Sequence, residues 1–476
     1  MLSLIPLPQL VQAGGAPFRL ASRTGLSGVP EPMAGWLRER TGLALDGSGA
    51  TALEFSLGAD GPPESYRLTI DQHGVRATAA DAAGLFYAGC TVEQLLTETP
   101  DGWTLPAVTI QDAPRFGYRG AMLDVARHFF EVAVVKRFID RIARLKLNRL
   151  HLHLSDDQGW RIEIASRPEL TAKASGTAVG GDPGGFFTQA DYAELVRYAA
   201  ARQITIVPEI DLPGHTHAVG LAYPELAEAP VLSDHVMEMI HGSDGVVPVP
   251  GEPFTGVAVG FSSLRIDDEA GYEFIADVLG ELAALTPGPY LHIGGDECLG
   301  TAPEAFARFL LRVTAMVAEL GKTPVAWHEA GAVAGLATGT VGQYWGFLQP
   351  NEIARACVDR LVGQGSKLIL SPADAVYLDM KPDADRPLGV LWTGGPTSLE
   401  RSYSWDPSTL VEGLEESSIL GVEAPLWTEK VVTPEHIDAL VFPRLMAAAE
   451  IAWSEPLGTP GRTWPDFQAR LAGLGS

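Results

Sequence analysis

Apolar and polar residues alternate with a short period in the first quarter of the chain. Residues 51–59, TALEFSLGA, alternate in this way and predict a half-buried strand. Residues 66–79, YRLTIDQHGVRATA, predict a β-hairpin. Residues 81–96, DAAGLFYAGCTVEQLL, have helical spacing, and Asp81 is a suitable N-terminal cap for this helix. These segments predict a small α+β domain over residues 1–112.

The pattern changes after a connector at residues 111–120, where short apolar runs begin to alternate with helical segments. In one such segment, residues 135–147, the apolar residues recur on a single stripe. Eight runs predict strands, at residues 120–127, 149–155, 204–211, 290–297, 324–329, 342–346, 367–373 and 421–427. This alternation predicts an α/β fold, a closed (β/α)8 TIM barrel over residues 113–476. The long Gly- and Pro-rich stretch at 216–262 predicts an active-site loop.

Polar or large aromatic residues follow every predicted strand at its carboxyl end, where TIM barrels carry their chemistry. In strand order they are Arg127 with His128, Asp156 with Asp157, Asp211 with His215, Asp296 with Glu297, Trp327 with Glu329, Trp345, Tyr377 with Asp379, and Trp427 with Glu429. One such residue would mean little, but the whole series predicts a polar pocket with aromatic walls. A sugar ring needs such a surface, because it both forms hydrogen bonds and stacks on aromatic rings.

The acid pair Asp296–Glu297 follows two glycines in LHIGGDECLG, residues 291–300. Adjacent acids usually form a solvated turn. Here the glycines allow the backbone to pass close to a ligand, because they lack a side chain. We therefore interpret this pair as functional.

Three histidines raise the question of a metal site. His151 and His153 share one face of HLHLSDD, and His215 in PGHTH could add a third ligand. Alternating histidines inside a barrel strand can equally form hydrogen-bonded packing, and the small number of suitable ligands favours that interpretation. His215 suits pairing with a carboxylate. Neither a metal nor another cofactor is predicted.

Composition narrows the range of partners. The 476 residues include 34 Lys and Arg against 59 Asp and Glu, and the net charge of −25 would repel nucleic acid and anionic membranes. Cys90, Cys298 and Cys357 form no CxxC motif, so a reducing compartment is indicated. No apolar run approaches the length of a membrane span, and the first residues do not resemble a secretory signal. We expect a cytoplasmic protein; a secreted protein whose signal peptide has been removed would fit the same observations.

Seven motifs taken together resemble family 20 of the glycoside hydrolases, the β-N-acetylhexosaminidases. The motifs are LDVARHFF, LHLHLSDDQGW, PEIDLPGHTHA, HIGGDE, AWHE, SPADAVYLDM and APLWTE. The resemblance spans nearly the whole chain and implies a small N-terminal domain beside a (β/α)8 barrel. It also implies exo-cleavage of terminal β-linked N-acetylglucosamine or N-acetylgalactosamine from a small carbohydrate substrate, without a metal.

The resemblance assigns roles to residues at the strand ends. Glu297 matches the general acid that protonates the leaving oxygen. His215 and Asp156 match the pair that supports this acid. Asp296 matches the residue that orients the substrate's 2-acetamido group, and Tyr377 would donate a hydrogen bond to the acetamido carbonyl. The pocket walls would be Trp327, Trp345 and Trp427, and the sugar hydroxyls would be held by Arg127, Asp379 and Glu429.

Three other classes of protein fit the sequence less well. A metal-dependent amidohydrolase would carry its His-x-His at the end of the first strand, whereas here the pair lies in the second. A catalytically silent sugar-binding protein would not need Asp296, Glu297 and His215 together. A conventional retaining glycosidase places two carboxylates about 5 Å apart around one bond. Neighbours in an extended segment point in different directions, so we expect the nucleophile to come from elsewhere than this acid pair. The resemblance to family 20 implies that it is the carbonyl oxygen of the substrate's own acetamido group.

Overall fold

The N-terminal domain is built on a six-stranded sheet. The computed structural model describes residues 2–49 and 51–474. The strands of this sheet, in spatial order, are β1 (Leu10–Ala13), β9 (Val108–Asp112), β5 (Tyr66–Asp71), β6 (Gly74–Ala79), β4 (Thr51–Leu57) and β3 (Gly25–Ser27). A smaller sheet contains β2 (Phe18–Arg19), β8 (Gly102–Leu105) and β7 (Thr97–Thr99). Helix α2 (Ala82–Leu95) contacts the larger sheet, and α1 (Glu31–Thr41) packs against α2.

The elements predicted in this domain are present. The alternating segment is strand β4, and β5 and β6 pair in antiparallel register as the predicted hairpin. Helix α2 begins where it was expected, because the side chain of Asp81 accepts a hydrogen bond from the amide of Gly84. The domain is therefore a mixed α+β unit, as predicted.

The rest of the chain forms a closed barrel of eight parallel strands. They are β10 (Tyr118–Asp124), β11 (Arg149–His153), β14 (Thr205–Glu209), β15 (Tyr290–His292), β16 (Thr323–Trp327), β17 (Val341–Tyr344), β18 (Leu368–Leu370) and β19 (Ile419–Leu426). Each overlaps one of the eight predicted runs, and β19 pairs with β10 to close the barrel. The predicted TIM barrel is confirmed.

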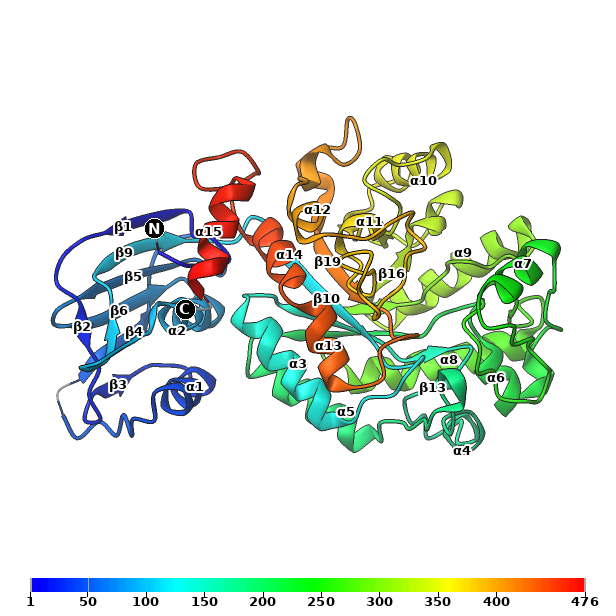
Figure 1. Ribbon diagram of the computed structural model, residues 1–476. Helices are drawn as coiled ribbons and strands as arrows, with labels where there is room; N and C mark the ends of the chain where they lie inside the picture. Colours follow the sequence, from blue (N-terminus) through cyan, green and yellow to red (C-terminus); the bar gives the residue numbers. More distant parts are fainter. Residues whose placement is uncertain (1, 50, 475–476) are drawn as a thin grey trace.

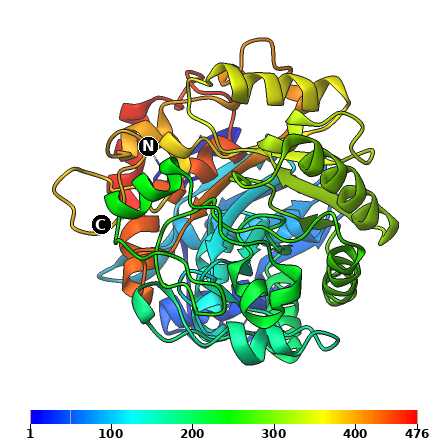
Figure 2. The same cartoon turned by 90° about the vertical axis from the view of Figure 1, so that its right-hand side faces the viewer.

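Helices surround this barrel (Figures 1 and 2). The longer ones are α3 (Val132–Arg144), α5 (Gln189–Ala200), α8 (Glu269–Leu285), α9 (Pro303–Glu319), α10 (Glu352–Gly363), α13 (Pro434–Val441) and α14 (Arg444–Trp453). Helix α15 (Trp464–Leu474) follows them in the chain. Short helices are α4 (Glu169–Ala174), α11 (Ala373–Val376) and α12 (Leu399–Tyr403). The predicted apolar stripe of α3 is buried against the barrel, which explains its helical spacing. Among the described helices, none is long and apolar enough to cross a membrane.

The connection between β14 and α8 covers one end of the barrel. It carries α6 (His217–Ala222), a 3₁₀ turn at Pro224–Leu226 and α7 (Asp234–Gly242). Figure 1 shows α7 at the end of the molecule that lies away from the N-terminal domain. This is the stretch predicted as an active-site loop.

A buried polar cluster joins the two domains. The ammonium group of Lys146, at the start of the turn into β11, donates to Asp112 Oδ2 at 2.9 Å and to the Tyr66 hydroxyl at 2.8 Å. The indole of Trp453 donates to the other oxygen of Asp112 at 3.0 Å. Helix α15 also lies between the domains (Figure 1), where Phe467 shares a core cluster with Ile5. The two domains therefore pack through two sets of specific contacts, the polar cluster around Asp112 and the apolar cluster that contains Phe467 and Ile5.

Candidate active site

A tight turn after β15 directs the acid pair into the barrel mouth. Gly294 and Gly295 have φ values of 67° and 100°, in the region that favours glycine. A Cβ on Gly294 would lie 1.6 Å from Oδ1 of Asp211, and the Gly295 amide donates to the same oxygen at 3.1 Å. Gly294 therefore permits a close approach to the Asp211 carboxyl. The close approach to a ligand that the sequence suggested stays a prediction.

A cavity of about 710 Å³ opens at the carboxyl ends of the strands. Most of the predicted site residues line it, namely Arg127, His215, Asp296, Glu297, Trp345, Tyr377, Asp379, Trp427 and Glu429. Helix α7 and the loop after it supply another part of its wall, including Met239 and Val257. The long connection thus lines the cavity, and the structure brings residues from six barrel strands together around it.

Asp156, His215 and Glu297 form a chain of close contacts. His215 Nδ1 lies 3.2 Å from Asp156 Oδ1, and His215 Nε2 lies 3.5 Å from Glu297 Oε2. Asp156 does not line the cavity; it lies buried behind the imidazole. His215 and Glu297 have φ values of 53° and 46°, which are uncommon for residues with side chains and are typical of functional sites.

The charges along this chain are well defined. Burial opposes the charged form of His215, yet the carboxylates of Asp156 and Asp211 raise its pKa well above the usual value. Burial also opposes ionisation of Asp156, but Arg127 and His215 hold its pKa well below the usual range. At neutral pH the pair is therefore an imidazolium and a carboxylate, and the imidazolium faces Glu297.

Asp296 is buried and keeps one oxygen unused. Its Oδ1 has no hydrogen-bond partner in the described part of the chain, while Oδ2 lies 3.8 Å from His215 Nε2. Burial raises the pKa of Asp296 to about 6; His215 opposes this shift and Glu297 adds to it. A buried carboxylate oxygen without a donor is costly. It can accept a hydrogen bond from a ligand N–H or O–H.

The segment that carries the two acids is not extended as the sequence predicted, because Glu297 has left-handed backbone geometry. As a result, a ring nitrogen of His215 and one carboxylate oxygen each of Asp296 and Glu297 lie within 4.8 Å of one another. Both carboxylates converge on the imidazole, so geometry alone does not exclude a carboxylate nucleophile.

Aromatic rings form one side of the cavity. Trp427 lies 6.2 Å from Tyr377, and Trp345 packs edge-on against Trp392 at 6.2 Å. Trp327, predicted as a wall, lines no part of this cavity and is 1% exposed. Its ring lies behind Trp427 at 6.0 Å, because its indole N–H is tied into the barrel interior by Glu209 at 3.0 Å.

Charged side chains form another part of the cavity wall. Arg127 Nη2 lies 2.7 Å from Asp156 Oδ2, its Nε lies 3.9 Å from Glu429, and its guanidinium stacks over Trp427 at 4.8 Å. Burial and the nearby Glu429 raise the pKa of Asp379 well above its usual value, and Asp379 Oδ1 has no partner among the described residues. Arg127 therefore links the chain behind Glu297 to the part of the pocket that contains Glu429.

The alternating histidines serve the barrel interior. His151 lies 3.0 Å from Glu209 and 2.8 Å from Glu423, and His153 lies 2.8 Å from Asp156. Their ring nitrogens therefore already have carboxylate partners, so the packing interpretation fits better than the metal one. A second group of possible metal ligands opens into the cavity and consists of His215, Asp296 and Glu297. The contacts of His215 with the nearby carboxylates, described above, already explain why these side chains lie together.

Trp392 and Glu209 contribute to the site although their roles were not predicted from the sequence. Trp392 lies in the Gly- and Pro-rich segment between β18 and α12, is 49% exposed and lines the cavity. It follows no strand, so the search at strand ends could not find it. Glu209 was not predicted as a site residue because it lies within a predicted strand and not after it. Its carboxylate accepts the indole N–H of Trp327 and contacts His151, His153 and His292.

Comparison with known proteins agrees with this arrangement. The profile "Glycosyl hydrolase family 20, catalytic domain" matches residues 116–302 and 299–456, and "Glycosyl hydrolase family 20, domain 2" matches residues 1–113. A β-N-acetylhexosaminidase of Cellulomonas fimi is 39% identical over 99% of this chain and 93% of its own. A β-hexosaminidase of Vibrio furnissii is 33% identical over 94% of this chain and 76% of its own.

Solved structures show the same architecture. A glycoside hydrolase family 20 β-N-acetylglucosaminidase superposes with a TM-score of 0.91 and 53% identity, covering 99% of this chain and 97% of its own. A mutant Streptomyces plicatus β-hexosaminidase in complex with product (GlcNAc) has a TM-score of 0.90 and 44% identity, covering 99% and 94%. The chain therefore belongs to glycosyl hydrolase family 20 and is a glycosidase of the β-N-acetylhexosaminidase type.

Proposed function

We propose that the enzyme removes terminal β-linked N-acetylglucosamine or N-acetylgalactosamine by a retaining, substrate-assisted mechanism. The observation that carries this proposal is the unpaired, buried Oδ1 of Asp296, which lines the same cavity as Glu297 and Tyr377. This oxygen is suited to accept the N–H of an acetamido group. The names of the relatives support the sugar, since one Streptomyces plicatus structure holds GlcNAc as product.

In the first step Glu297 donates its proton to the glycosidic oxygen, and the bond between that oxygen and the anomeric carbon breaks. General acid catalysis of this kind typically contributes about 100- to 10,000-fold. His215, 3.5 Å away, stabilises the Glu297 carboxylate that remains after donation, because it carries positive charge. Asp156 holds the imidazole in the orientation that this requires.

The acetamido carbonyl oxygen attacks the anomeric carbon as the leaving group departs, which gives an oxazolinium ion. Asp296 accepts the acetamido N–H and stabilises the positive charge that develops on this nitrogen. The hydroxyl of Tyr377 donates a hydrogen bond to the carbonyl oxygen and so helps to hold it in place. An intramolecular attack of this kind gains its rate from orientation. Water, deprotonated by Glu297, then opens the ion with net retention of configuration.

Other residues hold the sugar ring. Arg127, Asp379 and Glu429 bind its hydroxyl groups through hydrogen bonds, with charge assistance from the guanidinium of Arg127, and Trp345 and Trp427 flank its apolar surface. Small carbohydrates are the only partners proposed. The absence of nucleic-acid and membrane partners, and the cytoplasmic location, remain predictions.

A paired assay tests the proposed activity. Purified enzyme is given an aryl β-N-acetylglucosaminide and the matching aryl β-glucoside, which differ only at carbon 2. We expect release of the aryl alcohol from the first substrate and only background release from the second. Comparable rates on both would refute a role for the acetamido group.

A further inference from the structure

His153, the last residue of β11, lies directly behind the pair that supports the general acid. Its Nε2 lies 2.8 Å from Asp156 Oδ2, and the other oxygen of this carboxylate lies 3.2 Å from His215. Arg127, which lines the sugar pocket, lies 2.7 Å from the same Oδ2. The His153 ring is fully buried and packs edge-on against Trp427 at 4.9 Å. The mechanism described above gives His153 no part, although it contacts a residue of that mechanism.

Glu209 holds the other nitrogen of the His153 ring. Its Oε2 contacts His153 Nδ1 and lies 3.0 Å from His151, and its Oε1 accepts the indole N–H of Trp327 at 3.0 Å. All four side chains are at most 1% exposed. His153 is therefore clamped between two carboxylates, Glu209 in the barrel interior and Asp156 beside the catalytic imidazole.

The charges along this chain alternate. Burial opposes the charged form of His153, yet Glu209 and Asp156 raise its pKa well above the usual value. Burial also opposes ionisation of Glu209, but the three histidines around it hold its pKa well below the usual range. At neutral pH His153 is therefore an imidazolium, which donates one N–H to each carboxylate.

We infer that His153 is a positioning residue for the general acid: it holds the Asp156 carboxylate against His215, and Glu209 in turn holds His153. The inference rests on the proposed function, in which Glu297 donates the proton and His215 supports it. A shift of Asp156 would move the imidazole relative to Glu297. A misplacement of about 1 Å can cost about 100-fold in rate.

Two substitutions at His153 separate its two hydrogen bonds. The amide nitrogen of glutamine is as many bonds from the backbone as Nε2, so His153→Gln can keep the donor to Asp156. The amide nitrogen of asparagine corresponds to Nδ1, so His153→Asn keeps the donor to Glu209 and loses the one to Asp156. Both variants remove the positive charge. They differ in the hydrogen bond to which the inference assigns the positioning.

The readout is kcat on an activated aryl β-N-acetylglucosaminide divided by kcat on chitobiose. A weakened general acid slows the substrate with the poorer leaving group more. His153→Asn should therefore raise this ratio at least about tenfold, within the loss of about 100-fold that a misplaced group can cause. His153→Gln should keep the ratio near the wild-type value. The ratio does not depend on the fraction of enzyme that is folded, so partial misfolding cannot imitate the effect.

His151→Asn is the matched control. His151 lies on the same face of β11, is equally buried and also contacts Glu209. Its other nitrogen lies 2.8 Å from Glu423, in the barrel interior, and not beside Asp156. The ratio should therefore stay at the wild-type value, whatever the substitution costs in stability.

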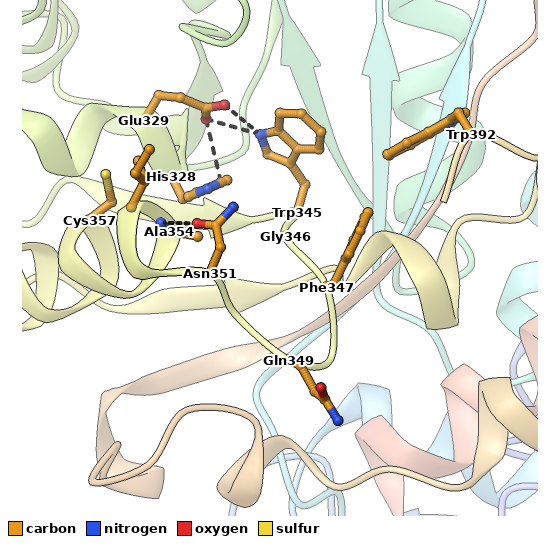
Figure 3. Close-up of a pocket in the computed structure, with 11 residues that line it drawn as sticks. His328, Glu329, Trp345, Gly346, Phe347, Gln349, Asn351, Ala354, Cys357 and Trp392 are labelled. Carbon is orange, nitrogen blue, oxygen red and sulfur yellow. Dashed lines mark hydrogen bonds and ion pairs between the residues drawn. The ribbon is translucent and has the colours of Figure 1, made fainter. Parts of the chain in front are cut away.

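Glu209→Gln tests the same chain from its other end and is decisive if His153→Asn does not fold. It should also raise the ratio, because a neutral amide holds the imidazolium less tightly than a carboxylate does. Glu329→Gln is the control for this substitution. Glu329 likewise accepts the indole N–H of a tryptophan, Trp345 at 3.0 Å, but its side chain otherwise contacts His328 (Figure 3). This variant should leave the ratio unchanged.

The outcomes separate the inference from the proposed function. A wild-type ratio in His153→Asn, or in Glu209→Gln if the former does not fold, would show that His153 has only a packing role. Equal increases in His153→Asn and His153→Gln, or in His153→Asn and His151→Asn, would also overturn the inference, because the bond to Asp156 would not be the cause. If the wild type hydrolyses neither substrate, the proposed function itself is refuted.

Discussion

The Nδ1 atom of His215 lies 3.2 Å from Asp156 Oδ1. The second oxygen of Asp156 lies 2.7 Å from Arg127 and 2.8 Å from His153. One buried carboxylate therefore orients the imidazole behind Glu297 and also holds an arginine of the sugar pocket. In the proposed mechanism, substrate binding and acid catalysis are therefore connected through Asp156.

Glu297→Gln should nearly abolish turnover of substrates with poor leaving groups, because these depend most on proton donation. The expected loss of kcat is about 100- to 10,000-fold for chitobiose, and it should be smaller for an activated aryl glycoside. Steady-state kinetics on both substrates measure it. Glu238→Gln, on the exposed face of α7, is the matched control and should behave as wild type. Normal hydrolysis of chitobiose by Glu297→Gln would refute the role of general acid.

The acid limb of the pH profile should come from Asp296. Burial raises the pKa of this carboxyl to about 6, with His215 opposing and Glu297 adding to the shift. The group is therefore protonated below this pH and ionised above it, and only the carboxylate can stabilise the positive charge on the acetamido nitrogen. We expect kcat/KM to rise with pH through about 6, since this parameter reports the free enzyme. The residual activity of Asp296→Asn should lack that limb; a variant that kept it would show that another group titrates there.

Two tryptophans that look alike in the sequence should behave differently. Trp345→Ala should raise KM roughly tenfold with little change in unfolding, because an aromatic contact adds about 0.5–1.5 kcal/mol to burial. Trp327→Ala should lower the free energy of unfolding by about 3–5 kcal/mol, since the ring is 1% exposed and packed in the barrel. Urea titration together with kinetics separates the two effects. Equal destabilisation by both changes would contradict the assignment.

The close approach at Gly294 gives a backbone prediction. Gly294→Ala would place a methyl group 1.6 Å from Asp211 Oδ1, at a φ of 67°. The turn must then shift, and a displacement of about 1 Å at the acid pair can cost about 100-fold in rate. We expect kcat to fall by at least this factor. Gly280→Ala, in helix α8 with no atom within 4 Å of the added methyl group, should leave activity unchanged. Wild-type kcat for Gly294→Ala would contradict the geometry.

The local pattern of apolar and polar residues was sufficient to predict the fold and most of the polar and aromatic residues that line the cavity. Periodicity predicted all eight barrel strands, because alternating strands and helices must bury their apolar faces against one another. Residues at strand ends then meet at one mouth, which brings Arg127, Tyr377 and Glu429 together even though they are far apart in sequence.

The misses have a common physical cause, which is that side-chain direction depends on tertiary contacts. Trp327 ends a strand like Trp345, but a bond to Glu209 turns it into the interior. The left-handed backbone of Glu297 could not be read from its neighbours, and it reversed the argument about diverging acids. Trp392 reaches the cavity from a loop without periodicity.

The central claim is that the substrate's own acetamido oxygen is the nucleophile, and one series of substrates tests it most directly. Aryl β-N-acetylglucosaminides with zero, one, two and three fluorine atoms on the acetyl methyl share the same leaving group but have a progressively less nucleophilic carbonyl oxygen. We predict that kcat/KM falls with each added fluorine. A rate that does not depend on fluorination would contradict substrate assistance and would point to a carboxylate nucleophile, which the convergence of Asp296 and Glu297 on His215 leaves geometrically open.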